Sequence, residues 1–139
     1  MKIVANIRVF FIAAALLLSQ DAAAVKPDDV VSVFKEVSDN LKSGDADKLS
    51  VRFASPIDLR VLAAEKTCSA RQAAEIVEEF FVQRKVVSFS MLHVGGKAGK
   101  HYGIGLLIAG DRRFRVTVLL LVSGRNSYTI QQLGIDYEN

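Results

Sequence analysis

The chain has 139 residues, a formal net charge of +3 and a single cysteine. This length suits one domain and is too short for two ordinary ones. A charge this small does not predict a nucleic-acid surface, which requires clustered basic residues, and a lone cysteine excludes an internal disulfide.

The N-terminus has the pattern of a secretory signal peptide. Lys2 and Arg8 precede an apolar run over residues 9–18, and an alanine triplet follows at residues 22–24. The alternative is a membrane anchor, but the run is about half of the roughly 20 apolar residues that a spanning helix needs. We therefore favour a cleaved signal peptide.

We predict cleavage between Ala24 and Val25. Residues 1–24 would then be the signal peptide, and residues 25–139 a single domain. The predicted location is the periplasm or the outside of the cell, with no stable membrane insertion after cleavage. The net charge of the mature chain falls to +2, because the removed segment holds two basic residues and one acidic residue.

Helical periodicity predicts a first helix that begins at Pro27-Asp28-Asp29 and ends at Gly44. Proline suits the first helical position, and acidic residues there favour the positive end of the helix dipole. The apolar positions of this helix recur at three- and four-residue intervals and form one stripe: Val30, Val33, Phe34, Val37 and Leu41.

A second, short helix is predicted directly after this glycine. Asp45 or Asp47 can supply its N-cap, and Leu49 and Phe53, four residues apart, would both face inward. Ser55-Pro56 ends the helix, because the residue before proline avoids the helical region.

A strand and a third helix are predicted next. Residues 57–61 alternate apolar and polar side chains, which indicates a half-buried strand. Ser69 caps the third helix, Gln72 completes a capping box, and Phe80-Phe81 indicates a broad face that packs against a sheet. Cys68 is interpreted as a small structural residue, with an intermolecular disulfide or a reactive thiol as the alternative.

Four strands with tight turns follow and predict an antiparallel meander. The first spans residues 87–92, and the central strand, Phe114–Val122, lies between residues 102–108 and 128–135. Gln131-Gln132 marks a change in the alternation of the last strand, which predicts a β-bulge that bends it.

The central strand has two different faces. One is uniformly apolar and should pack on the helices, whereas the other begins with Arg113 and Arg115 and then turns apolar. A sheet face in water should not carry such an apolar patch, so we predict a homodimer through it, with scattered surface leucines on a monomer as the alternative. By alternation, the dimer-face candidates are Leu107, Leu119, Leu121, Leu133 and Ile135.

The order of the predicted elements resembles the cone-shaped, cystatin-like fold of the nuclear transport factor 2-like superfamily. The segment Leu41–Leu49 is similar to its Gly-Asp junction between the first two helices. Tyr102–Gly105, Phe114–Val116 and Ile130–Ile135 resemble a smaller family of exported bacterial proteins that is catalogued as a domain of unknown function. The resemblance implies an α+β fold, with a curved antiparallel sheet wrapped around a long helix, and implies no activity.

The predicted function is a non-catalytic exported binding or scaffold domain, with a small apolar ligand or a protein partner. The alternative is a small-molecule isomerase, dehydratase or hydrolase-like enzyme that uses His93 with Tyr102 inside the cone. His93 and His101 have no third ligand nearby in the sequence, so no metal is expected, and no cofactor is expected. The candidate ligand-binding residues of the inner wall are Phe89, Met91, His93, Tyr102, Ile104, Val116 and Val118.

Overall fold

The computed structural model describes residues 29–124 and 127–139. The predicted signal peptide and its cleavage site lie outside these residues. The helices are α2 (Val30–Ser43), α3 (Ala46–Ser50) and α4 (Ala70–Gln83). The strands are β1 (Phe53–Val61), β2 (Ala64–Cys68), β3 (Val86–Lys97), β4 (Lys100–Ala109), β5 (Arg112–Ser123) and β6 (Ser127–Tyr137).

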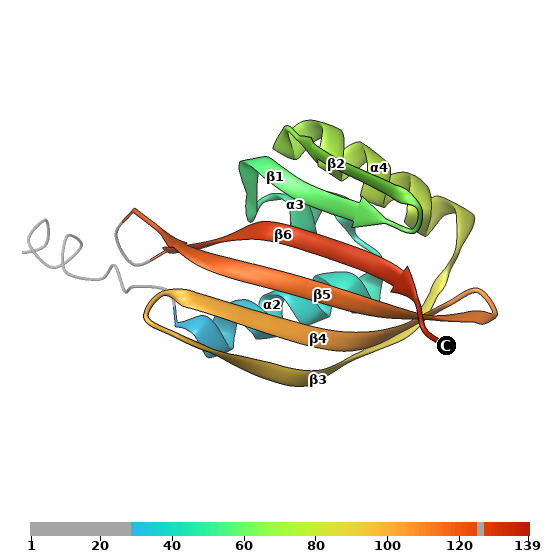
Figure 1. Cartoon of the computed structure of the whole chain (residues 1–139). Helices are drawn as coiled ribbons and strands as arrows, with labels where there is room; N and C mark the ends of the chain where they lie inside the picture. The colour runs from blue at the N-terminus through green and yellow to red at the C-terminus, as the bar shows by residue number, and fades with distance from the viewer. Residues whose placement is uncertain (1–28, 125–126) are drawn as a thin grey trace, which may run out of the picture.

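The six strands form one curved sheet in the order β2-β1-β6-β5-β4-β3, and the helices cover one of its faces (Figure 1). We call the face against the helices the inner face and the opposite one the outer face. The predicted meander of β3 to β6 is antiparallel throughout. The expected curved antiparallel sheet is present, except that β1 runs parallel to β6.

Local capping chemistry sets the helix boundaries, largely as the sequence predicts. Gly44 ends α2 in the left-handed conformation, at φ 65°, and the Asp45 side chain accepts a hydrogen bond from the Lys48 amide at the start of α3. Ser69 and Gln72 form the predicted capping box of α4. Asp29, expected in the first turn of α2, is instead its N-cap.

The prediction for Phe53 is wrong. This residue opens β1 and pairs with Ile130 of β6 rather than continuing α3. Pro56 does not break the strand, because it lies where the register between β1 and β6 shifts and no ladder pair is formed. Phe53 is nevertheless buried, so its inward direction is as expected.

Strand β2 has no counterpart in the sequence prediction. It pairs antiparallel with β1 through a two-residue turn, in which Leu62 has a φ of 55°. A two-residue hairpin turn normally carries glycine or asparagine at such a position. The signal that would mark this hairpin in the sequence is therefore missing.

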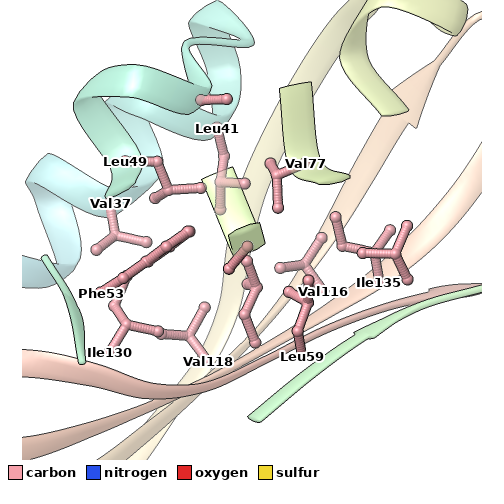
Figure 2. Close-up of a cluster of buried hydrophobic side chains, with 14 of the residues drawn as sticks. Val37, Leu41, Leu49, Phe53, Leu59, Val77, Val116, Val118, Ile130 and Ile135 are labelled. Atoms are coloured by element: carbon pink, nitrogen blue, oxygen red, sulfur yellow. The ribbon is translucent and has the colours of Figure 1, made fainter. Parts of the chain in front are cut away.

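The core lies between the helices and the inner face of the sheet, where side chains from both layers converge (Figure 2). Glycines on β4 leave room for aromatic rings of α2 and of the neighbouring strand β3 on the inner face. A Cβ atom at Gly105 would lie 2.3 Å from the ring of Phe89, and one at Gly103 would lie 2.8 Å from the ring of Phe34. The aromatic rings therefore occupy the space that side chains of β4 would otherwise fill.

We expect Gly105→Ala to lower the free energy of unfolding by roughly 1–3 kcal/mol, the usual cost of overpacking a core. Gly134→Ala is the matched control, because its Cβ would meet the flexible end of Arg60 and, at an ordinary contact distance, the Asp136 carboxylate on the outer face. That change should stay within about 1 kcal/mol of the wild type. Chemical denaturation measures both, and equal losses would contradict the packed inner face.

Candidate functional site

The outer face of the sheet carries an apolar patch that no described helix covers (Figure 1). On β4 and β5, Tyr102 lies opposite Leu119 and Lys100 lies opposite Leu121. The aliphatic side chains are half-buried by their neighbours, and Tyr102 is 40% exposed. We call this set the outer apolar patch: Tyr102, Ile104, Leu106, Leu119 and Leu121.

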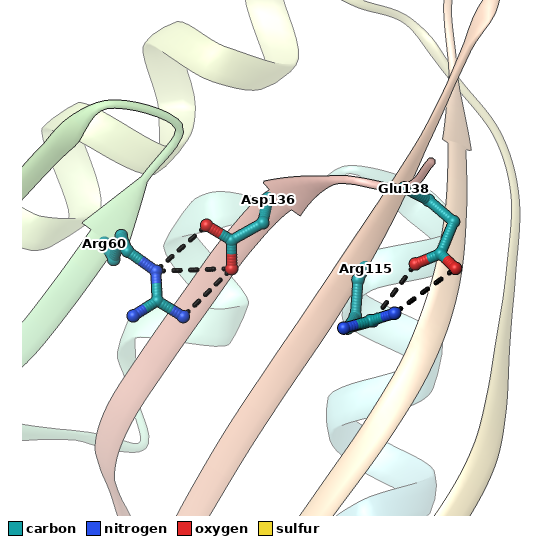
Figure 3. Close-up of polar contacts among 4 residues, drawn as sticks. All are labelled: Arg60, Arg115, Asp136 and Glu138. Carbon is teal, nitrogen blue, oxygen red and sulfur yellow. Dashed lines mark hydrogen bonds and ion pairs between the residues drawn. The ribbon is translucent and has the colours of Figure 1, made fainter.

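A row of alternating charges borders this patch on β1, β6 and β5 (Figure 3). Arg60 donates three hydrogen bonds to Asp136, with Nε–Oδ1 and Nη2–Oδ2 distances of 2.9 Å and an Nε–Oδ2 distance of 3.2 Å. Arg115 donates from Nε to Glu138 at 3.0 Å. The hydrogen bond to Asp136 and the attraction of its charge raise the pKa of Arg60 above its usual value.

A polar groove of about 490 Å³ lies beside this row, where β2 and β1 meet β6 and β5. Asp58 accepts a hydrogen bond from the Thr67 hydroxyl at 2.7 Å within it. Acidic, basic and neutral polar groups all line it, so the groove has no single charge preference. Its polar and charged lining residues are Asp58, Arg60, Glu65, Lys66, Thr67, Thr117 and Gln132.

The predicted ligand-binding wall does not form one surface. Val116 and Val118 are 1% and 0% exposed on the inner face, and Phe89 is also buried. A side chain that lined a cavity large enough for a ligand would keep accessible surface, so these residues are packed core. Met91 is half-buried on the same face.

The other predicted wall residues lie on the outer face. Register places Ile104 opposite His93 and Thr117, away from the inner face that Gly103 and Gly105 occupy. The assignment of His93, Tyr102 and Ile104 to the inner wall is therefore wrong. Alternation alone could not decide this, because either the large residues or the glycines of β4 can face the core.

His93 and Tyr102 do meet, as the enzyme hypothesis requires, but outside the cone. The His93 Nε2 atom lies 3.2 Å from the Tyr102 hydroxyl, and both side chains are exposed. This pair stands in solvent on the outer face, and the inner face is packed with side chains. Neither feature supports the enzyme alternative.

The predicted dimer-face residues also divide between the two faces. Leu119 and Leu121 lie on the outer face, as the alternation indicates. The assignment of Leu107, Leu133 and Ile135 to that face is wrong, because all three are 0% exposed in the core (Figure 2 labels Ile135).

The predicted bulge explains part of this error. Leu119 pairs with Gln132 while Leu120 pairs with Ile130, so Gln131 is the extra residue in β6. The bulge brings both Ile130 and Leu133 to the inner face. The outer apolar patch instead gains three residues of β4 that sequence reasoning assigned to the inner wall or left out, Tyr102, Ile104 and Leu106.

Within residues 29–124 and 127–139, no three His, Cys, Asp or Glu side chains are placed to hold a metal ion. None of the helices in the described part of the chain is long and apolar enough to cross a membrane.

The fold belongs to the nuclear transport factor 2-like (NTF2-like) class, in which a curved, unclosed sheet packs on helices. Within that class, the family model described as "Domain of unknown function (DUF4783)" matches residues 34–136, and the chain belongs to this family. The resemblance noted in the sequence to a domain of unknown function within this superfamily is thereby confirmed. No curated protein matches the chain.

Solved structures agree with this assignment. A DUF4783 family protein from Bacteroides ovatus is 28% identical, with a TM-score of 0.71 over 75% of this chain and 94% of its own. One from Bacteroides uniformis is 27% identical, with a TM-score of 0.72 over 76% and 96%. An NTF2-like protein of unknown function from Cytophaga hutchinsonii is 8% identical, with a TM-score of 0.59 over 83% and 94%, and shows the fold alone.

Cys68 ends β2 and is buried, with 6% of its surface exposed. We expect its thiol to react slowly with a thiol reagent in the native protein and rapidly after unfolding, because burial excludes the reagent. A non-reducing gel should show no disulfide-linked dimer, with Cys68→Ser as the control. Rapid labelling of the native protein would show that the thiol is accessible.

Proposed function

We propose that this protein is a non-catalytic, exported binding or scaffold domain that works as a homodimer, formed by packing the outer faces of two sheets together. The outer apolar patch carries this proposal. Half-buried aliphatic side chains lie together on a sheet face that no described element covers, and such patches mark interaction surfaces.

The size of the outer face suits a stable dimer. With ~4.8 Å between strands and ~3.3 Å per residue, the five longer strands, β1 and β3 to β6, at about ten residues each, present roughly 800 Å². A standard protein–protein interface buries about 800 Å² per partner. The whole outer face, rather than the patch alone, therefore supplies the required area.

The chemistry of the face suits a second copy of the same chain. An apolar centre bordered by polar and charged groups is the usual anatomy of an interface. The border contains both signs, with Arg60 and Arg115 beside Asp136 and Glu138. A face that carries both signs can meet its own copy across a two-fold axis without net repulsion.

Export is the second element of the proposal and rests on the N-terminal pattern of basic, apolar and small residues over residues 1–24. A location outside the cytoplasm also suits a domain whose only cysteine is buried, because no exposed thiol is left to oxidise.

We expect Leu119→Lys to weaken dimerisation about tenfold or more, equal to at least ~1.4 kcal/mol, because it places a charge at the apolar centre of the interface. Val82→Lys on α4 is the matched control, at a side chain that is 78% exposed on the helix side. Sedimentation over a wide concentration range measures both. A wild-type protein that stays monomeric at high concentration would refute the dimer.

Export predicts that the full sequence, expressed in a bacterium, yields a mature protein whose first residue is Val25. Intact-mass measurement of the periplasmic and culture fractions checks this directly. Replacing part of the apolar run at residues 9–18 with charged residues should trap the uncleaved chain in the cytoplasm. Accumulation of uncleaved wild-type protein in the cytoplasm would contradict the proposal.

A further inference from the structure

We propose that the free edge of β3 binds an extended peptide segment of another protein, apolar in its middle and acidic at both ends, by adding it to the sheet as a seventh strand. Strand addition of this kind draws affinity from main-chain hydrogen bonds and specificity from pockets beside the edge. This surface is separate from the outer face, so the inference goes beyond the proposed dimer.

The two edges of the sheet differ sharply (Figure 1). The edge strand β2 is five residues long and carries Glu65 and Lys66, both exposed. Short length and charge are the devices by which proteins prevent unwanted strand pairing. Strand β3 is twelve residues long, and residues 86–96 contain no proline and no Asp, Glu, Lys or Arg. The β2 edge is therefore short and charged, whereas the β3 edge is long and carries no Asp, Glu, Lys or Arg between Lys85 and Lys97.

The open edge exposes large apolar side chains. Val87 and Leu92 are each 67% exposed, and Val94 is 50% exposed. Val87 and Leu92 are the extra residues at the two register shifts between β3 and β4. Bulges can re-aim side chains. Here the side chains at the bulges are apolar, although they face solvent.

A groove runs between this edge and helix α2. It has a volume of about 310 Å³ and is lined by Phe34, Lys35 and Ser38 of α2 and by residues 91–94 of β3. A smaller groove of about 190 Å³ shares Phe34 and Val94 with it and continues to the first turn of α2. Successive side chains of a strand point to opposite faces, so alternate side chains of an added strand would face this groove on the helix side.

The charges at the ends of β3 select the partner. Lys85 precedes the strand, and Lys97 closes it opposite Lys100 of β4, all three exposed. In an antiparallel pair of two β3 strands, Lys85 of each copy would lie near Lys97 of the other. Like charges placed across a strand pair destabilise it. The same lysines attract an extended segment with acidic residues at both ends.

The test uses the whole protein and a fluorescent peptide of alternating valine and threonine residues with aspartates at both ends. A second peptide has lysines at both ends, and a third has aspartate ends and a central proline, which removes a main-chain donor. Anisotropy should show saturable binding of the first peptide. The other two should bind about tenfold more weakly or not at all.

Variants of the protein locate the site. Val94→Lys should weaken binding of the aspartate-ended peptide about tenfold or more, because it adds a charge at the apolar edge. Val51→Lys is the matched control, at a valine that is 83% exposed after α3, and should leave binding unchanged. Both changes are at exposed side chains, and thermal melts verify that both variants are folded.

Reversing the charges at both ends of β3 gives the most discriminating test. The double variant Lys85→Glu with Lys97→Glu should prefer the lysine-ended peptide over the aspartate-ended one, and Leu119→Lys should bind as the wild type does. Absence of saturable binding to the wild type, equal binding to Val94→Lys, or an unchanged preference in the double variant would each overturn the proposal. Pairing of the wild type with the double variant in place of peptide binding would identify a second copy as the occupant and also overturn it.

Discussion

The close approach of aromatic rings to backbone glycines holds this fold together. Strand β4 presents Gly103 and Gly105 to the helix side, and the rings of Phe34 and Phe89 lie against them. Because protein interiors are packed as densely as organic crystals, the sheet can curve around α2 only while those positions lack side chains. The same contacts fill the concave side of the sheet, so Tyr102 and Ile104, the residues of β4 next to these glycines, point outward.

This arrangement decides where the protein can interact. An open cone would place binding chemistry inside the sheet, but here the inner face is occupied by side chains such as Val118 and Leu120 that have no exposed surface. The surfaces that we propose for recognition are the outer face and the free edge of β3. The outer face combines an apolar centre with paired charges, and the edge combines exposed valines and a leucine with basic ends. The two can be used at the same time, because one is a face and the other a border of the same sheet.

The sequence predicts features that depend on neighbouring residues and fails where distant residues decide. The cap at Gly44, the capping box at Ser69 and the bulge at Gln131 are local, and all three are present. The face on which Leu133 lies depends on the bulge, and the direction of Tyr102 depends on rings from other elements. Strand β2 escaped prediction because its turn uses Leu62 in a conformation that glycine normally adopts.

The parallel pairing of β1 with β6 has a consequence for the order of folding. Phe53 pairs with Ile130, so nearly the whole described chain must be made before β1 gains β6, its second neighbour in the sheet. Contacts between residues so distant in sequence form late, because closing a long loop costs entropy before any contact compensates for it. The β3–β5 meander can assemble from adjacent segments, and so can the β1–β2 hairpin with the helix α4 that packs on β1, but these two parts join only when β6 is available. A chain synthesised from its N-terminus therefore completes its sheet last at β6, which inserts between the β1–β2 hairpin and the β3–β5 meander.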